Sequence, residues 1–183
     1  MRADTPTCPP RSALTEGLPH AAIGQWYVLH TKSRQEKLLA DTLKAKGIAH
    51  FLPMTRQVRF YGRHKLKVEV PLFASYLFLR GEVDDVYAAD RTGRVAQIIS
   101  VTNQNRLDWE LQNIQLALVR GADLNSHARL LAGTPVAVRS GPFRGLQGLV
   151  ESDQHAGRLV LQVDMLGRAV SLEIDSSLLD RLD

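Results

Sequence analysis

The sequence predicts an α+β fold, in which an N-terminal α/β sandwich with an antiparallel sheet precedes a small all-β barrel. Over residues 26–118, short aromatic and β-branched runs alternate with segments whose apolar residues repeat at helical spacing. Beyond residue 133, strand-like runs follow one another with glycine-containing turns between them and no helical pattern. A long helix and a polar stretch close the first region, so the chain is expected to form two domains.

The expected domain boundaries follow the changes in composition. The first residues are rich in Pro and Thr and lack a continuous apolar run, which is typical of a disordered extension. The polar stretch without periodicity is expected to be a flexible linker. The predicted parts are an extension at 1–23, a first domain at 24–120, a linker at 121–132 and a second domain at 133–183.

The first domain is expected to begin with a strand and a helix. Residues 26–30, Trp-Tyr-Val-Leu-His, have strong β propensity. Ser33 and Glu36 then fit a capping box, in which the Ser33 hydroxyl accepts from the backbone of Glu36 and the carboxylate reaches back. Gly47 can end the helix that follows.

The rest of this domain alternates between strands and helices. Apolar and polar residues alternate on both sides of Tyr61-Gly62, which predicts a basic hairpin or an extended loop over residues 56–70. A strand is expected at 76–79, a short helix at 83–89 and another strand at 95–101. The closing helix has one apolar face, made of Leu107, Leu111, Ile114 and Leu118.

The second domain opens with a glycine-punctuated element. Residues 136–138 alternate as a half-buried strand, and Ser140-Gly141-Pro142 breaks it because glycine allows positive φ and proline fixes φ for a turn. Apolar residues return at 149–150, followed by a strand at 159–163, a turn at 165–168 and a strand at 169–174.

Positive charge is concentrated near the start of the first domain. Residues 24–70 contain ten Lys and Arg but only Glu36, Asp41 and Glu69, whereas the whole chain has a formal net charge of +4. A basic face of this kind is typical either of a polyanion-binding surface or of a surface that only keeps the protein soluble. Charge alone does not decide between these two interpretations.

No pattern typical of an enzyme, a metal site or a membrane protein is present. The six histidines are dispersed and form no His-Glu-x-x-His motif, and no phosphate-binding glycine loop follows a strand. Cys8 is the only cysteine, which excludes an internal disulfide and fits a reducing, cytoplasmic environment. No apolar run of about 18 residues exists. We expect a non-catalytic, cytoplasmic, monomeric protein without metal or cofactor.

Two groups of residues resemble the NusG family of transcription factors. Gly133–Val150 resembles its KOW motif, a strand–loop–strand element, and the strands that follow match its C-terminal domain. Residues 71–78, Pro-Leu-Phe-Ala-Ser-Tyr-Leu-Phe, resemble the most distinctive segment of its N-terminal (NGN) domain. The resemblance covers everything but the extension, and details of residues 71–78 are similar to specialised paralogues of the RfaH type.

The resemblance implies that the first domain binds the clamp of RNA polymerase and that the factor suppresses pausing and termination. It assigns polymerase docking to Tyr76, Phe78 and Phe73, although alternating aromatics on a strand are also typical of a core. It also implies contacts with nontemplate DNA, for which the basic residues are candidates. The candidates for nucleic-acid binding are Lys32, Arg34, Arg56, Arg59, Arg63, Lys65 and Lys67.

In the second domain, the resemblance implies a partner-binding surface on two loops. The implied partners are a small-subunit ribosomal protein or the termination helicase Rho. The candidate residues are Leu146, Met165, Leu166 and Arg168, of which Leu166 is expected to be exposed at a turn tip. Two alternatives remain open: a housekeeping factor that supports Rho-dependent termination, and an RNA- or ribosome-binding KOW protein.

Overall fold

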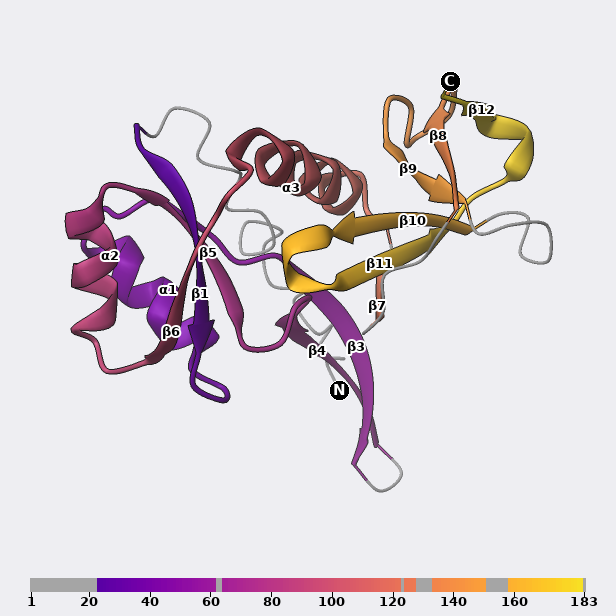
Figure 1. Ribbon diagram of the computed structural model, residues 1–183. Helices are drawn as coiled ribbons and strands as arrows, with labels where there is room; N and C mark the ends of the chain where they lie inside the picture. Colours follow the sequence, from indigo (N-terminus) through magenta and orange to yellow (C-terminus); the bar gives the residue numbers. More distant parts are fainter. Residues whose placement is uncertain (1–22, 62–63, 123, 128–132, 151–157, 183) are drawn as a thin grey trace.

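The computed structural model describes residues 23–61, 64–122, 124–127, 133–150 and 158–182. The predicted extension, apart from Ile23, lies outside these residues. The chain forms a mixed N-terminal region and an all-β C-terminal region that meet at the long helix α3 (Gln104–Val119) (Figure 1). This confirms the predicted α+β class. Within the described residues, no helix is long and apolar enough to cross a membrane.

The N-terminal region is built on a four-stranded sheet with the order β2-β5-β1-β6, and its paired strands are antiparallel. Alternate side chains of these strands point to opposite faces, so the sheet has two apolar sides to cover. The elements are β1 (Gln25–Thr31), α1 (Glu36–Ala45), β2 (His50–Phe51), β5 (Tyr76–Gly81), α2 (Val83–Asp90) and β6 (Val95–Ser100).

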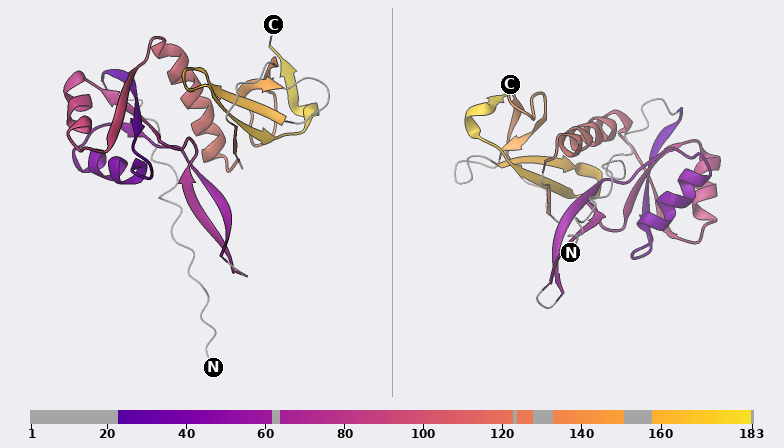
Figure 2. Two further views of the ribbon diagram at one scale, coloured as in Figure 1. Left: turned by 60° about the horizontal axis from the view of Figure 1, so that its bottom comes forward. Right: turned by 180° about the vertical axis from the view of Figure 1, so that it is seen from behind.

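Helices cover both sides of this sheet (Figure 2). On one side, Leu29 and Leu77 pack in a buried cluster with Leu39 of α1 and Val86 of α2. On the other side, strand and α3 residues form a second cluster, to which Trp26, Val28, Phe51, Phe73, Phe78, Leu107, Leu111, Ile114 and Ala117 contribute. The predicted apolar face of the closing helix is therefore confirmed, except that Leu118 is only half-buried.

The predicted capping box of the first helix is wrong. The N-cap residue is Gln35, without a side-chain cap hydrogen bond. The Glu36 carboxylate instead accepts a hydrogen bond from the backbone N–H of Ser75 (2.7 Å). Ser75 precedes β5 with a positive φ of 66°. A partly buried loop amide needs a partner, and the buried Glu36 carboxylate supplies it, so a tertiary contact replaces the local cap.

Strands β3 (Met54–Tyr61) and β4 (His64–Pro71) form a separate two-stranded sheet. Figures 1 and 2 show that this hairpin projects away from the rest of the molecule. Tyr61 pairs with His64, so the two strands come together on either side of Gly62 and Arg63, which lie outside the described residues. At its base, Thr55 Oγ1 donates to the carbonyl oxygen of Leu124 (3.3 Å), which ties the hairpin to the segment after α3.

The C-terminal region is a six-stranded antiparallel sheet with the order β12-β8-β9-β10-β11-β7. Strand β7 lies inside the range predicted as a linker, where it pairs with β11, and β12 was not predicted. The elements are β7 (Asn125–His127), β8 (Thr134–Val138), β9 (Gln147–Val150), β10 (Arg158–Val163), the 3-10 turn η2 (Asp164–Leu166), β11 (Arg168–Glu173), the 3-10 turn η3 (Ser176–Leu178) and β12 (Leu179–Arg181).

Helix α3 joins the two regions through a shared core. The cluster beneath α3 continues into the C-terminal sheet, where Val136, Leu159 and Leu161 belong to it. Figure 1 shows β10 running beside α3. The side-chain Oδ1 of Asn113 on α3 accepts a hydrogen bond from the backbone N–H of Gln147 (2.9 Å), the first residue of β9. One helix therefore buries apolar surface of both regions.

Candidate functional site

The strand register divides the predicted basic residues of the hairpin between two faces. Directly opposed residues of an antiparallel pair share a face, and Arg56 opposes Glu69, Val58 opposes Lys67 and Phe60 opposes Lys65. We call the face of Arg56, Val58, Phe60, Lys65, Lys67 and Glu69 the basic face. The opposite face holds Gln57, Arg59, Leu66, Val68 and His64. Arg63 lies outside the described residues.

The basic face carries exposed apolar groups between its cations. Phe60 is 71% exposed and Val58 is 44% exposed. Arg56 lies 3.7 Å from the Glu69 carboxylate, and both side chains are solvent-accessible, so this pair contributes little stability. The basic face therefore retains net positive charge beside an uncovered aromatic ring.

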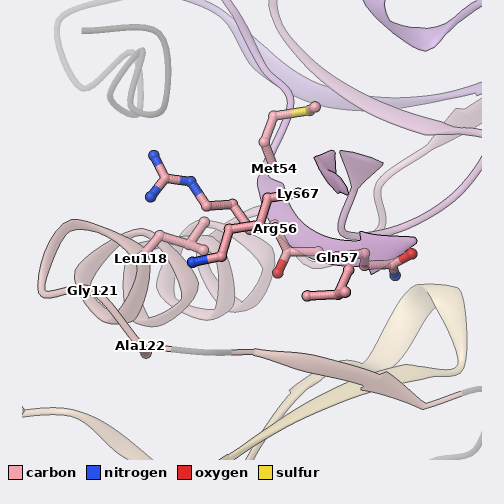
Figure 3. A pocket seen from close by; sticks show the side chains of 9 residues that line it. Met54, Arg56, Gln57, Lys67, Leu118, Gly121 and Ala122 are labelled. Atoms are coloured by element: carbon pink, nitrogen blue, oxygen red, sulfur yellow. The ribbon is translucent and has the colours of Figure 1, made fainter. Parts of the chain in front are cut away.

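A cleft of about 380 Å³ lies where the basic face meets the C-terminal end of α3. Arg56, Val58 and Lys67 line it from the hairpin, and Leu118 and Gly121 line it from the helix end. In Figure 3 the side chains of Arg56 and Lys67 extend toward the side of the cleft that Leu118 forms. Two cations and apolar walls thus converge on one hollow surface.

Lys32 and Arg34 lie in the turn between β1 and α1, on a different element from the hairpin. The Lys32 ammonium donates to the carbonyl oxygen of Gly93 (2.6 Å), and its backbone N–H donates to the carbonyl of Arg94 (2.9 Å). Arg34 is exposed and has a positive φ of 60°. The structure thus uses Lys32 to hold two loops together and leaves the guanidinium of Arg34 in solvent.

The residues predicted to dock on polymerase differ in their exposure. Phe78 and Phe73 are buried, and their rings lie edge to face with centroids 6.2 Å apart. Tyr76 is half-buried, and its ring centroid is 5.1 Å from that of His30 on the neighbouring strand. In this conformation only Tyr76 of the three presents side-chain surface to a partner.

The predicted partner-binding residues of the C-terminal region are also unequal. Leu146 is fully buried. Met165 and Leu166 of η2 are half-buried and pack against the cluster that contains Phe73 and Phe78. The expected exposure of Leu166 is therefore wrong, because its side chain packs against the apolar cluster that the two regions share. Arg168, at the start of β11, is half-buried.

An ionic group at the junction of the two regions does not stand out in the sequence. Arg106 contacts Glu110 on the same helix (3.1 Å) and also pairs with the Asp164 carboxylate of η2. The i, i+4 spacing of Arg106 and Glu110 was a local signal for the first contact. Nothing local indicates Asp164, because the contact joins residues far apart in the chain.

Glu110 is buried, and this burial raises the pKa of its carboxyl, while the hydrogen bond from Arg106 opposes the shift. A carboxyl with a raised pKa in the folded state gives stability that is lost as pH rises from its unfolded pKa through its folded pKa. We expect Glu110→Gln to remove this loss, so the stability of the variant relative to the wild type should increase from pH 4 toward pH 7. Urea denaturation across this range measures it.

The control for this prediction is Glu173→Gln, which removes an exposed carboxylate of β11. Its stability should stay within about 0.5 kcal/mol of the wild type, because exposed substitutions change little. A Glu110→Gln difference that is flat, or that falls with rising pH, would contradict the assignment of Glu110 as a buried acid whose ionisation destabilises the fold.

A family model and named relatives point to one family. The family model described as "Transcription termination factor nusG" matches residues 24–115. The protein named "Transcription termination/antitermination protein NusG" of Rickettsia conorii is 29% identical over 168 residues, which cover 84% of this chain and 88% of the relative. Its namesake of Escherichia coli K12 is 26% identical over 173 residues, covering 86% and 96%.

A solved structure described as "Domain interaction in Thermotoga maritima NusG" is also similar. It is 19% identical, covers 87% of this chain and 97% of that chain, and superposes with a TM-score of 0.44. Among the described residues, no group of three or more His, Cys, Asp and Glu could hold a metal ion. Because the family model spans half of the chain and the relatives align through both regions, this chain belongs to the NusG family.

Proposed function

We propose that this chain is a transcription elongation factor that binds RNA polymerase through its N-terminal region and suppresses pausing and termination. The observation that carries the proposal is the match of the NusG family model to residues 24–115, which include the whole N-terminal sheet. The relatives named above are termination/antitermination proteins. Either activity requires contact with the transcription machinery.

Tyr76 is the side chain from which docking is best tested. It is half-buried at the edge of an apolar cluster, and tyrosine combines apolar area with a hydroxyl that tolerates water, as interface residues require. Phe73 and Phe78 support it from below, because their rings are buried in the same cluster. We assign them a supporting role rather than direct contact in this conformation.

The C-terminal region is proposed to bind a second partner, a ribosomal protein or Rho, through the η2 turn. Met165 and Leu166 pack against the cluster that Tyr76 also contacts. A partner that takes these side chains must therefore displace an intramolecular contact. One experiment distinguishes a specialised RfaH-like antiterminator from a housekeeping factor, because the two predict opposite effects on Rho-dependent termination.

That experiment is single-round transcription by the cognate polymerase through a pause site and a Rho-dependent terminator. We expect the full chain to shorten the pause. Tyr76→Ala should weaken the apparent affinity for polymerase by tenfold or more, since interface hot spots contribute about 2 kcal/mol or more. Tyr76→Phe separates the ring from the hydroxyl. Increased read-through would favour the antiterminator, and increased Rho-dependent release would favour the housekeeping factor.

The matched control is Leu38→Ala, which removes an exposed apolar side chain from α1 on the other side of the sheet. It should leave pausing unchanged. A Tyr76→Ala protein that folds and still shortens the pause at wild-type concentrations would remove Tyr76 from the docking surface. No effect of the wild-type chain on elongation would overturn the proposed function.

A further inference from the structure

A hollow of about 140 Å³ lies between α3 and the C-terminal sheet. We call it the junction hollow, because α3 forms one of its walls and the strands β9 and β10 form another. Its described lining includes none of the residues that were predicted to bind polymerase, nucleic acid or a second partner. The lining residues that matter here are Arg106, Trp109, Glu110 and Asn113 of α3, Leu149 of β9 and Leu161 of β10.

The size and the walls of the junction hollow fit one aromatic ring. An engineered cavity of about 150 Å³ in another protein binds a single benzene molecule. On the helix wall, Trp109 is 45% exposed, although indole is a large apolar group. On the strand wall, Leu149 and Leu161 supply aliphatic surface. A flat ring that entered the hollow would stack on the indole and remove apolar surface from water.

The charged groups of the junction hollow lie at one end. Arg106 pairs with Glu110 (3.1 Å) and with Asp164, so one guanidinium is shared by two carboxylates. Leu149 pairs with Val160 inside β10, whereas Asp164 follows the end of that strand, so apolar surface lies toward the other end. The charge balance at the polar end favours a cationic ligand, and the rest of the hollow favours an apolar body.

One carboxylate oxygen of this lining has no hydrogen-bond donor. Glu110 is only 4% exposed. Its Oε1 atom accepts hydrogen bonds from Arg106 Nε (3.1 Å) and from the backbone N–H of Asp164 (3.4 Å). Its Oε2 atom accepts none from the residues that the structure describes. An unpaired oxygen on a buried carboxylate is costly, and a charged donor on a ligand would supply the missing partner.

We propose that the junction hollow binds a small cation with one aromatic ring, such as an arylamidine or an arylalkylamine. The cationic group donates to Glu110 Oε2 and faces the Asp164 carboxylate, and the ring lies between Trp109 and Leu161. A neutral aromatic molecule would leave Oε2 unpaired, and an aliphatic cation would leave the apolar walls in water. Because the ligand contacts both regions of the fold, its binding stabilises the contact between them.

The test is two-dimensional amide NMR of the isotope-labelled full chain, titrated with benzamidine at pH 7. We expect saturable shifts of the Gln147 and Gly148 amides and of the Trp109 indole, which all belong to the lining. A ligand of this size should have a Kd of about 1 mM or lower. Benzamide keeps the ring without the charge, and acetamidine keeps the charge without the ring. Each should bind about tenfold more weakly than benzamidine or worse.

Two variants test the assigned contacts. Glu110→Gln should weaken benzamidine binding about tenfold at pH 7, because it removes the charge from the acceptor. Trp109→Ala should weaken binding about fivefold, because it removes the stacking surface. The wild-type affinity should fall from pH 7 toward pH 4, since burial raises the pKa of the Glu110 carboxyl and protonation removes its charge. The charged groups in contact with Glu110 are Arg106 and Asp164. Glu110→Gln should lose most of this pH dependence.

Matched controls make the same chemical changes away from the junction hollow. Glu173→Gln removes an exposed carboxylate from β11, and Tyr87→Ala removes a 54% exposed aromatic side chain from α2. Both should change the affinity for benzamidine no more than about twofold, because a distant, exposed group contributes little at moderate salt. Thermal unfolding checks that all variants fold.

Three results would overturn the proposal. The first is the absence of saturable shifts at the lining residues. The second is binding of benzamide as tight as that of benzamidine. The third is tighter binding of a capped Phe-Arg dipeptide, which would mean that the junction hollow takes side chains of a protein. The assay contains no polymerase, so its failure leaves the proposed function standing, and failure of the transcription experiment leaves this binding result unaffected.

Discussion

Phe78→Ala is expected to lower the free energy of unfolding by about 3–5 kcal/mol, the range for removing a large aromatic side chain from a core. Phe78 is fully buried on β5. Its ring lies edge to face with Phe73 at 6.2 Å and 6.5 Å from the ring of Phe51. Truncation would leave a cavity between the sheet and α3, whose residues share the cluster. Urea denaturation followed by circular dichroism measures the loss.

Phe60→Ala is the matched control, because it makes the same chemical change at a ring that is 71% exposed. Its free energy of unfolding should stay within about 0.5 kcal/mol of the wild type. If Phe78→Ala kept wild-type stability while losing its effect on polymerase, Phe78 would be a docking residue and its burial in this conformation would be incidental.

Gly148→Ala is expected to destabilise the C-terminal sheet by about 3 kcal/mol, at the upper end of the cost of overpacking. Gly148 lies in β9, opposite Val136 of β8. A Cβ atom at this position would lie well within van der Waals contact distance of the Val160 carbonyl oxygen and 3.1 Å from Leu161 Cδ2. The carbonyl belongs to the backbone of β10, so relief of the clash requires two paired strands to separate.

Gly145→Ala is the comparison for this prediction. It also replaces a glycine with alanine near β9, but nothing lies within 4 Å of the added Cβ, and only its positive φ of 87° opposes the change. That conformation costs an L-residue about 1–2 kcal/mol. A smaller loss for Gly148→Ala than for Gly145→Ala in chemical denaturation would show that the packing of β9 on β10 is looser than described.

Two of these variants, one in each region, also test the shared core. Because α3 buries residues of both regions in one cluster, we expect Phe78→Ala and Gly148→Ala to shift a single unfolding transition. Separate transitions would mean that the two regions unfold independently.

The position and type of most elements were predictable because each strand and helix has a local apolar period. The aromatic run at 26–30, the alternation on both sides of Tyr61 and the helical face that begins at Leu107 all correspond to observed elements. Strands β7 and β12 were missed. Each has three residues, too few for a period, and each is defined by the strand with which it pairs.

The candidate site was only partly predictable, because exposure depends on what packs from elsewhere. Tyr76 and Phe78 lie two residues apart on one strand and share a face, yet Phe78 is buried and Tyr76 is half-buried. Leu166 looked exposed at a turn tip, but its side chain packs against the apolar cluster that the two regions share. A short stretch of sequence contains neither α3 nor the opposing sheet, so it could not show which of these side chains are exposed.

Local chemistry in the chain was enough to specify the α+β class, the order of the main elements, the basic hairpin and the resemblance to the NusG family. Tertiary structure determined which cations share a face with Phe60, how Glu36 replaces a predicted cap by binding the Ser75 amide, and where Asp164 meets Arg106. The periodicity of apolar residues and the chemistry of turn residues act over a few residues, so both can be recognised in the sequence. Register, burial and ion pairing between distant segments depend on the balance of all the packed surfaces, and they exist only once the chain has folded.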